Sequence, residues 1–123
     1  MRIKIIGAGS IGNHLANASR ALNWSVDIVD IDKKALVRAK EEIYPSRYGQ
    51  WDDSINLYIS EDAPKNKYDL ICIGTPPDSH INLALEAIKE NPKAILIEKP
   101  LCGPDLVGCE KLYEKSKDKD ILV

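Results

Sequence analysis

The chain has 123 residues, of which 44% are hydrophobic and 29% are charged, a composition typical of one soluble globular domain. Its 17 Lys and Arg residues against 19 Asp and Glu residues give a formal net charge of −2. Because these charges are scattered, neither nucleic acid nor a membrane is expected as a partner. No apolar run reaches the length of a membrane span, and Met1 leads directly into a strand-like segment, so we expect a cytoplasmic protein.

Short β-branched runs alternate along the chain with longer stretches in which apolar residues have helical spacing. The predicted strands are Arg2–Ile6, Val26–Asp30, Ile55–Ile59, Asp69–Ile73, Ala94–Glu98 and Ile121–Val123. The predicted apolar helix stripes are Ile11/Leu15/Ala18/Leu22, Leu36/Ala39/Ile43, Ile81/Ala84/Leu85/Ile88 and Leu106/Cys109/Tyr113. This order predicts an α/β fold, a doubly wound parallel sheet of about six strands in a single three-layer Rossmann domain over residues 1–123.

The third predicted strand is the least secure element of this sheet. Only Ser60–Lys67 separates it from the fourth strand, whereas a parallel crossover usually needs about a dozen residues. We therefore expect this strand to be short or to lie at the edge.

A glycine-rich loop follows the first predicted strand and opens the first predicted helix. Gly7, Gly9 and Gly12 have the GxGxxG spacing, with Ser10 and Ile11 between the last two. In this context the first glycine permits a tight turn, the second allows the backbone to approach a pyrophosphate, and the third allows close helix–strand packing. The loop therefore predicts a dinucleotide-binding site.

An acidic residue stands at the expected distance from that loop. Asp30 lies 18 residues after Gly12, at the end of the second predicted strand, with Ile31 beside it. A carboxylate there accepts hydrogen bonds from ribose hydroxyls and repels a 2′-phosphate, which predicts NAD(H) rather than NADP(H). NADP(H) remains the alternative because Lys33 and Lys34 could attract a 2′-phosphate.

Two further segments follow the fourth and fifth predicted strands, at the edge of the sheet where the nicotinamide half of a dinucleotide binds. The first contains Thr75, Pro76, Pro77 and His80, in which the prolines restrict the backbone and Asp78 or Ser79 can cap the next helix. For His80, a packing role is at least as well supported as a catalytic one.

The second segment is Glu98, Lys99 and Pro100, which ends an apolar strand abruptly. A lysine at this place can reach a substrate oxygen and stabilise a developing alkoxide or assist proton transfer. The alternative is a surface lysine paired with Glu98.

The combination of GAGSIG, Asp30, TPPDSH and EKPL resembles the N-terminal domain of the glucose-fructose oxidoreductase and inositol dehydrogenase (Gfo/Idh/MocA) family over almost the whole chain. The resemblance implies an NAD(P)-dependent oxidoreductase acting on sugars, inositols or related polyols. It also implies a catalytic position for Lys99, a nicotinamide-side loop at Thr75, Pro76, Pro77 and His80, and a cofactor or supporting contact from Glu98.

Complete members of this family carry a second domain that supplies a catalytic histidine and much of the substrate site. No such domain is expected within 123 residues, so we expect this chain to bind NAD and to catalyse little by itself. Substrate would then bind only with that second domain, and self-association stays open.

A different class of protein, stand-alone regulatory domains that sense NAD or ATP in potassium-uptake systems, shares the glycine loop and the acidic residue. It gives no reason for the lysine–proline pair after the fifth strand. The three cysteines, Cys72, Cys102 and Cys109, lack the spacing of a metal site or disulfide framework, so we interpret them as small buried hydrophobic residues and expect no metal.

Overall fold

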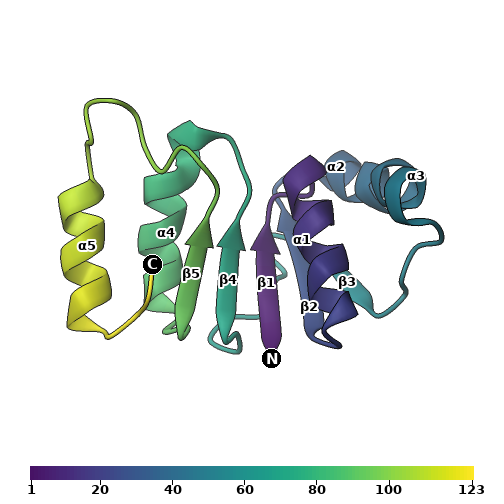
Figure 1. Cartoon of the computed structure of the whole chain (residues 1–123), viewed down its shortest axis with the longest axis horizontal. Coiled ribbons are helices and arrows are strands. Elements are labelled where there is room, and N and C mark those ends of the chain that lie inside the picture. The colour runs from purple at the N-terminus through teal and green to yellow at the C-terminus, as the bar shows by residue number, and fades with distance from the viewer.

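The computed structural model describes all residues from 1 to 123 and contains one parallel sheet with the strand order β3-β2-β1-β4-β5 (Figure 1). The strands are β1 (Arg2–Ile6), β2 (Ser25–Asp30), β3 (Ile55–Ile59), β4 (Leu70–Ile73) and β5 (Ala94–Ile97). The doubly wound parallel sheet is confirmed, and each of these strands lies within one residue of its predicted bounds. The expectation that β3 lies at the edge is also confirmed.

The helices are α1 (Ser10–Ala21), α2 (Lys33–Arg38), α3 (Tyr44–Tyr48), α4 (His80–Lys89) and α5 (Cys109–Asp118). A π-helical turn, Ala39–Ile43, joins α2 to α3, and a 3₁₀ turn, Pro77–Ser79, precedes α4. In Figure 1, α1 lies in front of the sheet and α4 lies behind it, which gives the predicted three layers. No helix is both long enough and apolar enough to cross a bilayer.

The predicted sixth strand, Ile121–Val123, is wrong as an extended strand. Only Leu122 pairs with the sheet, through a parallel bridge to Ala94. Ile95 N donates to Leu122 O and Leu122 N donates to Lys93 O, while the left-handed backbone at Asp120 turns the chain immediately before this contact. The sheet therefore has five strands and one bridging residue.

Two hydrophobic cores lie on opposite faces of the sheet. On the α1 face, the core joins β1, β2 and β3 to α1 and α2 through residues such as Ile5, Ile28 and Leu36. On the α4 face, the core joins β4 and β5 to α4 and α5 through residues such as Ile71 and Ile88. Each face thus has helices over only one part of the sheet.

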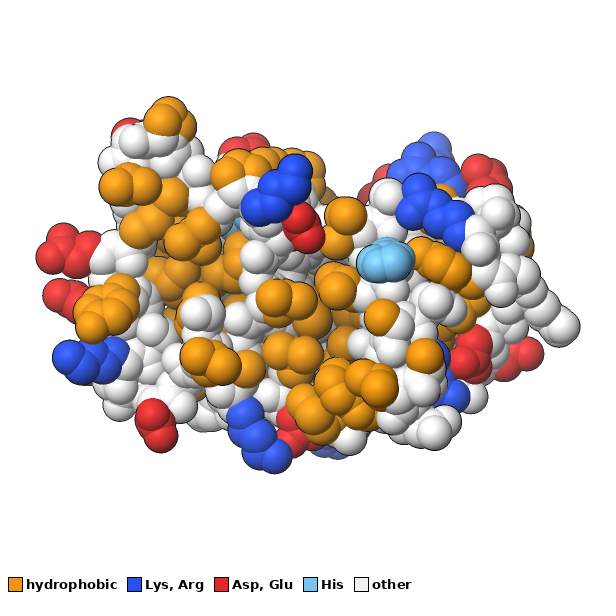
Figure 2. Space-filling view, viewed as in Figure 1, with side chains coloured by type: hydrophobic (Ala, Val, Ile, Leu, Met, Phe, Trp, Pro, Cys, Tyr) orange, Lys and Arg blue, Asp and Glu red, His pale blue; other side chains and the backbone are white.

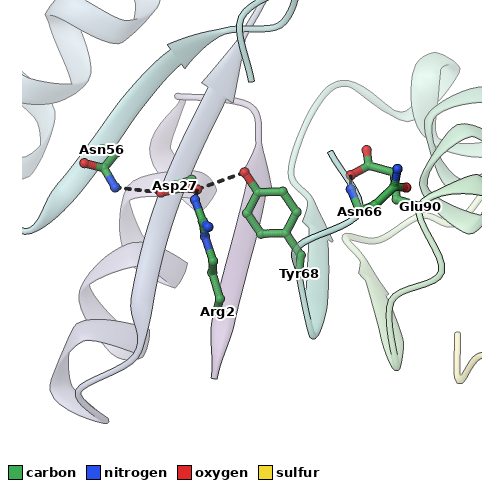
Figure 3. Close-up of polar contacts among 6 residues, drawn as sticks. All are labelled: Arg2, Asp27, Asn56, Asn66, Tyr68 and Glu90. Carbon is green, nitrogen blue, oxygen red and sulfur yellow. Dashed lines mark hydrogen bonds and ion pairs between the residues drawn. The ribbon is translucent and has the colours of Figure 1, made fainter. Parts of the chain in front are cut away.

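The half of the α4 face that no helix covers carries polar residues. The connection from β3 to β4 contains no helix, so no helix of this connection covers β1, β2 and β3 on this side. Asp27 is fully buried there and accepts hydrogen bonds from Arg2 Nη2 (2.8 Å), Asn56 Nδ2 (2.8 Å) and Tyr68 Oη (2.8 Å) (Figure 3). A buried carboxylate is tolerated because it is paired and fully hydrogen-bonded.

Lys4 and Glu90 extend this cluster toward α4. Lys4 Nζ donates to Glu90 Oε1 at 2.6 Å and lies 4.7 Å from the centre of the Tyr68 ring. The other Glu90 oxygen accepts from the backbone N–H of Asn66, as Figure 3 shows. The loop before β4 is thereby attached to the C-terminal end of α4.

The uncovered half of the α1 face is apolar instead. Leu70 and Ala94 share this side of β4 and β5 with Leu96, which is 48% exposed. Figure 2 shows hydrophobic side chains across the centre of this face, with charged residues mostly at its margins. The two parts of the sheet that no helix covers therefore differ: one carries ion pairs and the other carries aliphatic side chains.

The apolar stripe predicted for α1 is wrong. Its buried residues are Gly12, Asn13, Ala16 and Ser19, whereas Ile11 and Leu22 of the predicted stripe are exposed. The helix approaches the sheet so closely that small residues face it, and hydrophobicity alone misses that face. The stripe predicted as Leu106/Cys109/Tyr113 is also wrong, because Leu106 precedes α5 and the buried residues of this helix are Leu112 and Ser116.

Burial by itself would raise the pKa of Asp27, but hydrogen bonds from Asn56, Arg2 and Tyr68 outweigh it and hold the pKa below its ordinary value. The carboxylate form therefore stabilises the folded state. This contribution is complete above the unfolded-state pKa of 3.8 and is lost as the pH falls through the lower folded-state value.

We expect Asp27→Asn to lower the free energy of unfolding by about 2 kcal/mol at pH 7, because it removes a charged acceptor of three hydrogen bonds. Urea denaturation measures the change, with Asp53→Asn, at an exposed aspartate, as the control. The difference between wild type and variant should shrink below about pH 4. An undiminished difference at low pH would contradict the assignment.

Candidate functional site

The glycine loop brings the N-terminus of α1 against the end of β1. Gly7 has a φ of +109°, and its backbone N–H donates to Val29 O at 2.8 Å. A Cβ at Gly12 would lie 1.9 Å from Gly7 O, a distance that no side chain tolerates. These two positions therefore require glycine for the turn and for the close contact.

Gly9 plays a different part in the loop. Its φ of −80° is open to any residue, and a Cβ built there would meet nothing within 4 Å. The free space lies at the N-terminus of a 12-residue helix, where backbone N–H groups and the helix dipole attract phosphate. Glycine at this position keeps the backbone accessible from the cleft.

Asn13 fixes the glycine loop through two hydrogen bonds, a role that was not predicted from the sequence. Its Nδ2 donates to Ala8 O (3.0 Å) and Gly9 O (2.8 Å), and the side chain is fully buried. The sequence signal for this role was a polar residue directly after Gly12, on the side of α1 that packs against the sheet.

Asp30 ties the end of β2 to the same loop. One carboxylate oxygen accepts from Ala8 N and the other accepts from Asp32 N, both at 2.9 Å. Asp32 in turn caps α2 by accepting from Lys34 N. The Asp30 carboxylate is therefore held in one orientation beside the loop.

A cleft of about 520 Å³ runs along the carboxyl ends of the strands. The predicted site residues that line it are Gly7, Gly9, Asp30, Ile31, Thr75 and Pro76. The lining also includes Arg38, Ser60, Asp78 and Ser79, which the sequence reading did not assign to the cofactor. Two stretches that are far apart in the sequence thus face one concavity.

The predicted loop residues Ser10, Ile11 and Gly12 lie next to this cleft and do not line it. Ser10 Oγ accepts from Arg47 Nη1 at 2.7 Å. Ile11 is 38% exposed and packs beside Gly74.

The basic groups near Asp30 also differ from expectation. Lys33 lines a separate groove on the outer side of α2, and neither Lys33 nor Lys34 lines the cleft. Arg38, one turn further along the helix, is the cation that does. Ala35, which also lines the cleft, precedes Arg38 by three residues, so the two lie on the same face of the helix.

The segment after β4 forms a compact hydroxyl-bonded turn. Thr75 Oγ1 and Ser79 Oγ are 2.6 Å apart, and Ser79 Oγ donates to Pro76 O at 2.7 Å. Neither Ser79 nor another side chain caps α4, so the predicted capping role is wrong. Pro77 faces a neighbouring groove and not the cleft.

His80 joins this turn to the segment after β5. It is fully buried, with Nδ1 2.9 Å from Pro100 O and Nε2 2.7 Å from Thr75 O. A neutral imidazole has one N–H for these two carbonyl oxygens, whereas an imidazolium has two. Both nitrogens are engaged with backbone, so His80 positions loops and does not point into the cleft.

Glu98, Lys99 and Pro100 follow β5 and lie outside the cleft lining. Glu98 N donates to Ile73 O, which extends the pairing of β5 with β4, and the Lys99–Pro100 peptide bond is cis. Lys99 is exposed and forms none of the ion pairs in the structure, so the alternative pairing with Glu98 does not occur. His80 links this segment to Thr75, because its two ring nitrogens contact Pro100 O and Thr75 O.

Solved structures similar to this chain share its fold. UDP-N-acetylglucosamine 3-dehydrogenase GnnA from Acidithiobacillus ferrooxidans has 22% identity and a TM-score of 0.78, and the match covers 98% of this chain and 36% of that one. Biliverdin reductase from Synechocystis sp. PCC 6803, with biliverdin and NADP⁺, has 19% identity, a TM-score of 0.76, and coverage of 98% and 36%.

A third similar structure is the WlbA dehydrogenase from Bordetella pertussis, with NADH and UDP-GlcNAcA, at 19% identity, a TM-score of 0.68, and coverage of 98% and 35%. The chain thus spans about a third of the length of these proteins. No curated protein sequence matches it.

The sequence model of one family, described as an oxidoreductase family with an NAD-binding Rossmann fold, matches residues 1–123 in full. The match agrees with the glycine loop, the carboxylate at the end of β2 and the strand order. It does not favour the regulatory potassium-uptake alternative. The chain belongs to the Gfo/Idh/MocA oxidoreductase family and is an NAD-binding Rossmann domain of that family.

Proposed function

We propose that this domain binds NAD(H) in the cleft along the strand ends and serves an oxidoreductase that transfers hydride between the nicotinamide and a sugar, inositol or related polyol. The observation that carries this proposal is the single concavity that joins Gly9, Asp30 and Thr75. A dinucleotide in this fold spans from the second strand, across the loop after the first, to the loop after the fourth.

The residues present fit three parts of such a cofactor. The open backbone at Gly9 and the N-terminus of α1 suit the pyrophosphate. Each Asp30 oxygen already accepts one backbone N–H and keeps a lone pair for a ribose hydroxyl. The Thr75–Pro76 turn suits the nicotinamide side, held in shape by Ser79 and His80.

Asp30 and Arg38 act in opposite directions on the choice between NAD and NADP. The fixed Asp30 carboxylate repels a 2′-phosphate, whereas the guanidinium of Arg38 in the same cleft attracts one. We propose NAD as the preferred cofactor because Asp30 is already oriented by two backbone hydrogen bonds.

The substrate class rests on the resemblance of the EKP segment and on similar structures. One of those proteins is named as a UDP-N-acetylglucosamine dehydrogenase, and another holds UDP-GlcNAcA. Lys99 is exposed two residues after the end of β5, where its ammonium group could hold a substrate oxygen and stabilise negative charge on it. Since the chain spans about a third of those proteins, we propose that turnover needs residues of a second domain.

We expect Gly9→Ala to weaken NAD binding by at least about tenfold, because its methyl group would occupy the space left for the pyrophosphate. Its stability should stay within about 1 kcal/mol of wild type, since Ala adopts a φ of −80° without strain. Isothermal titration and urea denaturation measure the two quantities.

Gly12→Ala is the matched comparison. Its Cβ would collide with Gly7 O, so it should lose at least about 3 kcal/mol of stability. Equal stabilities for the two variants would rule out the separate roles assigned to these glycines.

We expect Asp30→Asn to weaken NAD binding by about tenfold and to improve NADP binding, because the ribose hydroxyls lose a charged acceptor and the repulsion of the 2′-phosphate is removed. Arg38→Ala should weaken NADP binding and leave NAD binding within about twofold. Titration with both cofactors measures the ratio, with Asp53→Asn as the control. A wild-type preference for NADP would refute the assignment of NAD.

We expect Lys99→Ala to leave NAD affinity within about twofold of wild type and to reduce hydride transfer by at least about 100-fold, because the substrate oxygen loses its cation. Affinity is measured on this domain, and NADH formation is measured on the longest polypeptide encoded with it. Lys65→Ala, at another exposed lysine, is the control. Unchanged turnover in Lys99→Ala would remove Lys99 from the catalytic centre.

A further inference from the structure

Two cysteines face each other across the loop that connects β5 to α5. Cys109 Sγ donates a hydrogen bond to Cys102 Sγ at 2.8 Å, and both side chains are partly exposed. The expectation of buried hydrophobic cysteines is therefore confirmed for Cys72, which is 1% exposed, and is wrong for this pair. Neither cysteine lines the cofactor cleft.

The surroundings of the two thiols suit oxidation. Cys109 is the first residue of the 10-residue helix α5, and Cys102 lies on the loop that precedes this helix. The hydrogen bond between the two thiols, followed by burial, raises the pKa of the Cys102 thiol. Both residues are accessible to a small reagent, because Cys102 lines an open groove beside Ile81 and Lys111, and Cys109 lines a second open groove beside Leu112 and Tyr113.

We propose that Cys102 and Cys109 are a modification site at which a reversible intramolecular disulfide closes the loop between them. The two sulfur atoms need to approach from 2.8 Å to about 2.0 Å. Residues 103–108 separate the cysteines, so the bond closes a short ring at the start of α5.

The oxidant is a low-molecular-weight disulfide, and the exchange is balanced. One protein thiol loses its proton, attacks a sulfur of the small disulfide and releases the first small thiol. The second protein thiolate then attacks the resulting mixed disulfide and releases the second small thiol. Two cysteine thiols are oxidised to one disulfide, and one small disulfide is reduced to two thiols.

The loop that would be closed has few attachments of its own. Its internal hydrogen bonds are Leu106 N to Gly103 O and Val107 N to Asp105 Oδ1, and Leu106 has a left-handed backbone. Leu106 and Val107 are 65% and 70% exposed. A disulfide would therefore restrict backbone motion that these two hydrogen bonds allow.

Closing the ring would also act on the strand-end loops. A Cβ at Gly108 would lie 2.6 Å from Ile81 Cγ2, so the loop already rests on the first turn of α4. The residue before Ile81 is His80, whose two hydrogen bonds hold Pro100 and Thr75. The oxidised ring would thus fix the segment beside Lys99.

The test is titration of the reduced protein with glutathione disulfide, followed by alkylation and mass spectrometry of the tryptic peptide 94–111. This peptide contains both cysteines, because Lys99 precedes proline and resists trypsin. We expect the peptide to lose two hydrogen atoms and both alkylation sites together, and dithiothreitol to restore them. Cys72 should stay unmodified until the protein is unfolded, because burial raises its pKa to about 12.

Cys102→Ser and Cys109→Ser supply the matched controls. Each should keep a single bound glutathione, because the mixed disulfide has no second thiol to resolve it. Hydrogen exchange of residues 100–108 should slow on oxidation of wild type and stay unchanged in both variants. Addition of one glutathione to each cysteine of the wild type, or disulfides between two chains, would overturn the proposal. None of these measurements depends on NAD binding.

Discussion

The close approach of α1 to β1 is the contact on which the rest of the site depends. With a Cβ at Gly12 only 1.9 Å from Gly7 O, the helix can occupy this position only if residue 12 has no side chain. The same approach aims the helix N-terminus along the strand end, places Asn13 under the loop, and brings Ala8 N to the carboxylate of Asp30. One steric requirement therefore sets the geometry of both the helix N-terminus and the Asp30 carboxylate, at which we propose that pyrophosphate and ribose bind.

The sheet was predictable from the sequence because its strands are continuous β-branched runs between turn residues. The buried faces of the helices were less predictable. Periodicity placed Ala84 and Ile88 of α4 correctly in the core, since that helix packs through aliphatic side chains at ordinary distance. It failed for α1, which packs through Gly12, Ala16 and Ser19. A hydrophobic pattern reports a helix face only where large side chains fill the space.

The candidate site shows the same division. The glycine spacing and Asp30 were readable because each meets a local geometric need that few residue types satisfy. The position of Arg38 in the cleft depends on how α2 sits on the sheet, and the use of both His80 nitrogens depends on two loops that meet only in the folded chain. The contact between Cys102 and Cys109 likewise arises from the path of a loop, which residue spacing does not determine.

The central position of β1 has a consequence for how the chain folds. β1 pairs on one side with β2 and on the other with β4, so the turn that follows it is fixed only when Gly7 N donates to Val29 O and Gly74 N donates to Ile6 O. These contacts are distant in sequence, which makes folding slow relative to helical proteins of this size. A ligand that needs this completed turn binds only the native state, so its binding raises the free energy of unfolding.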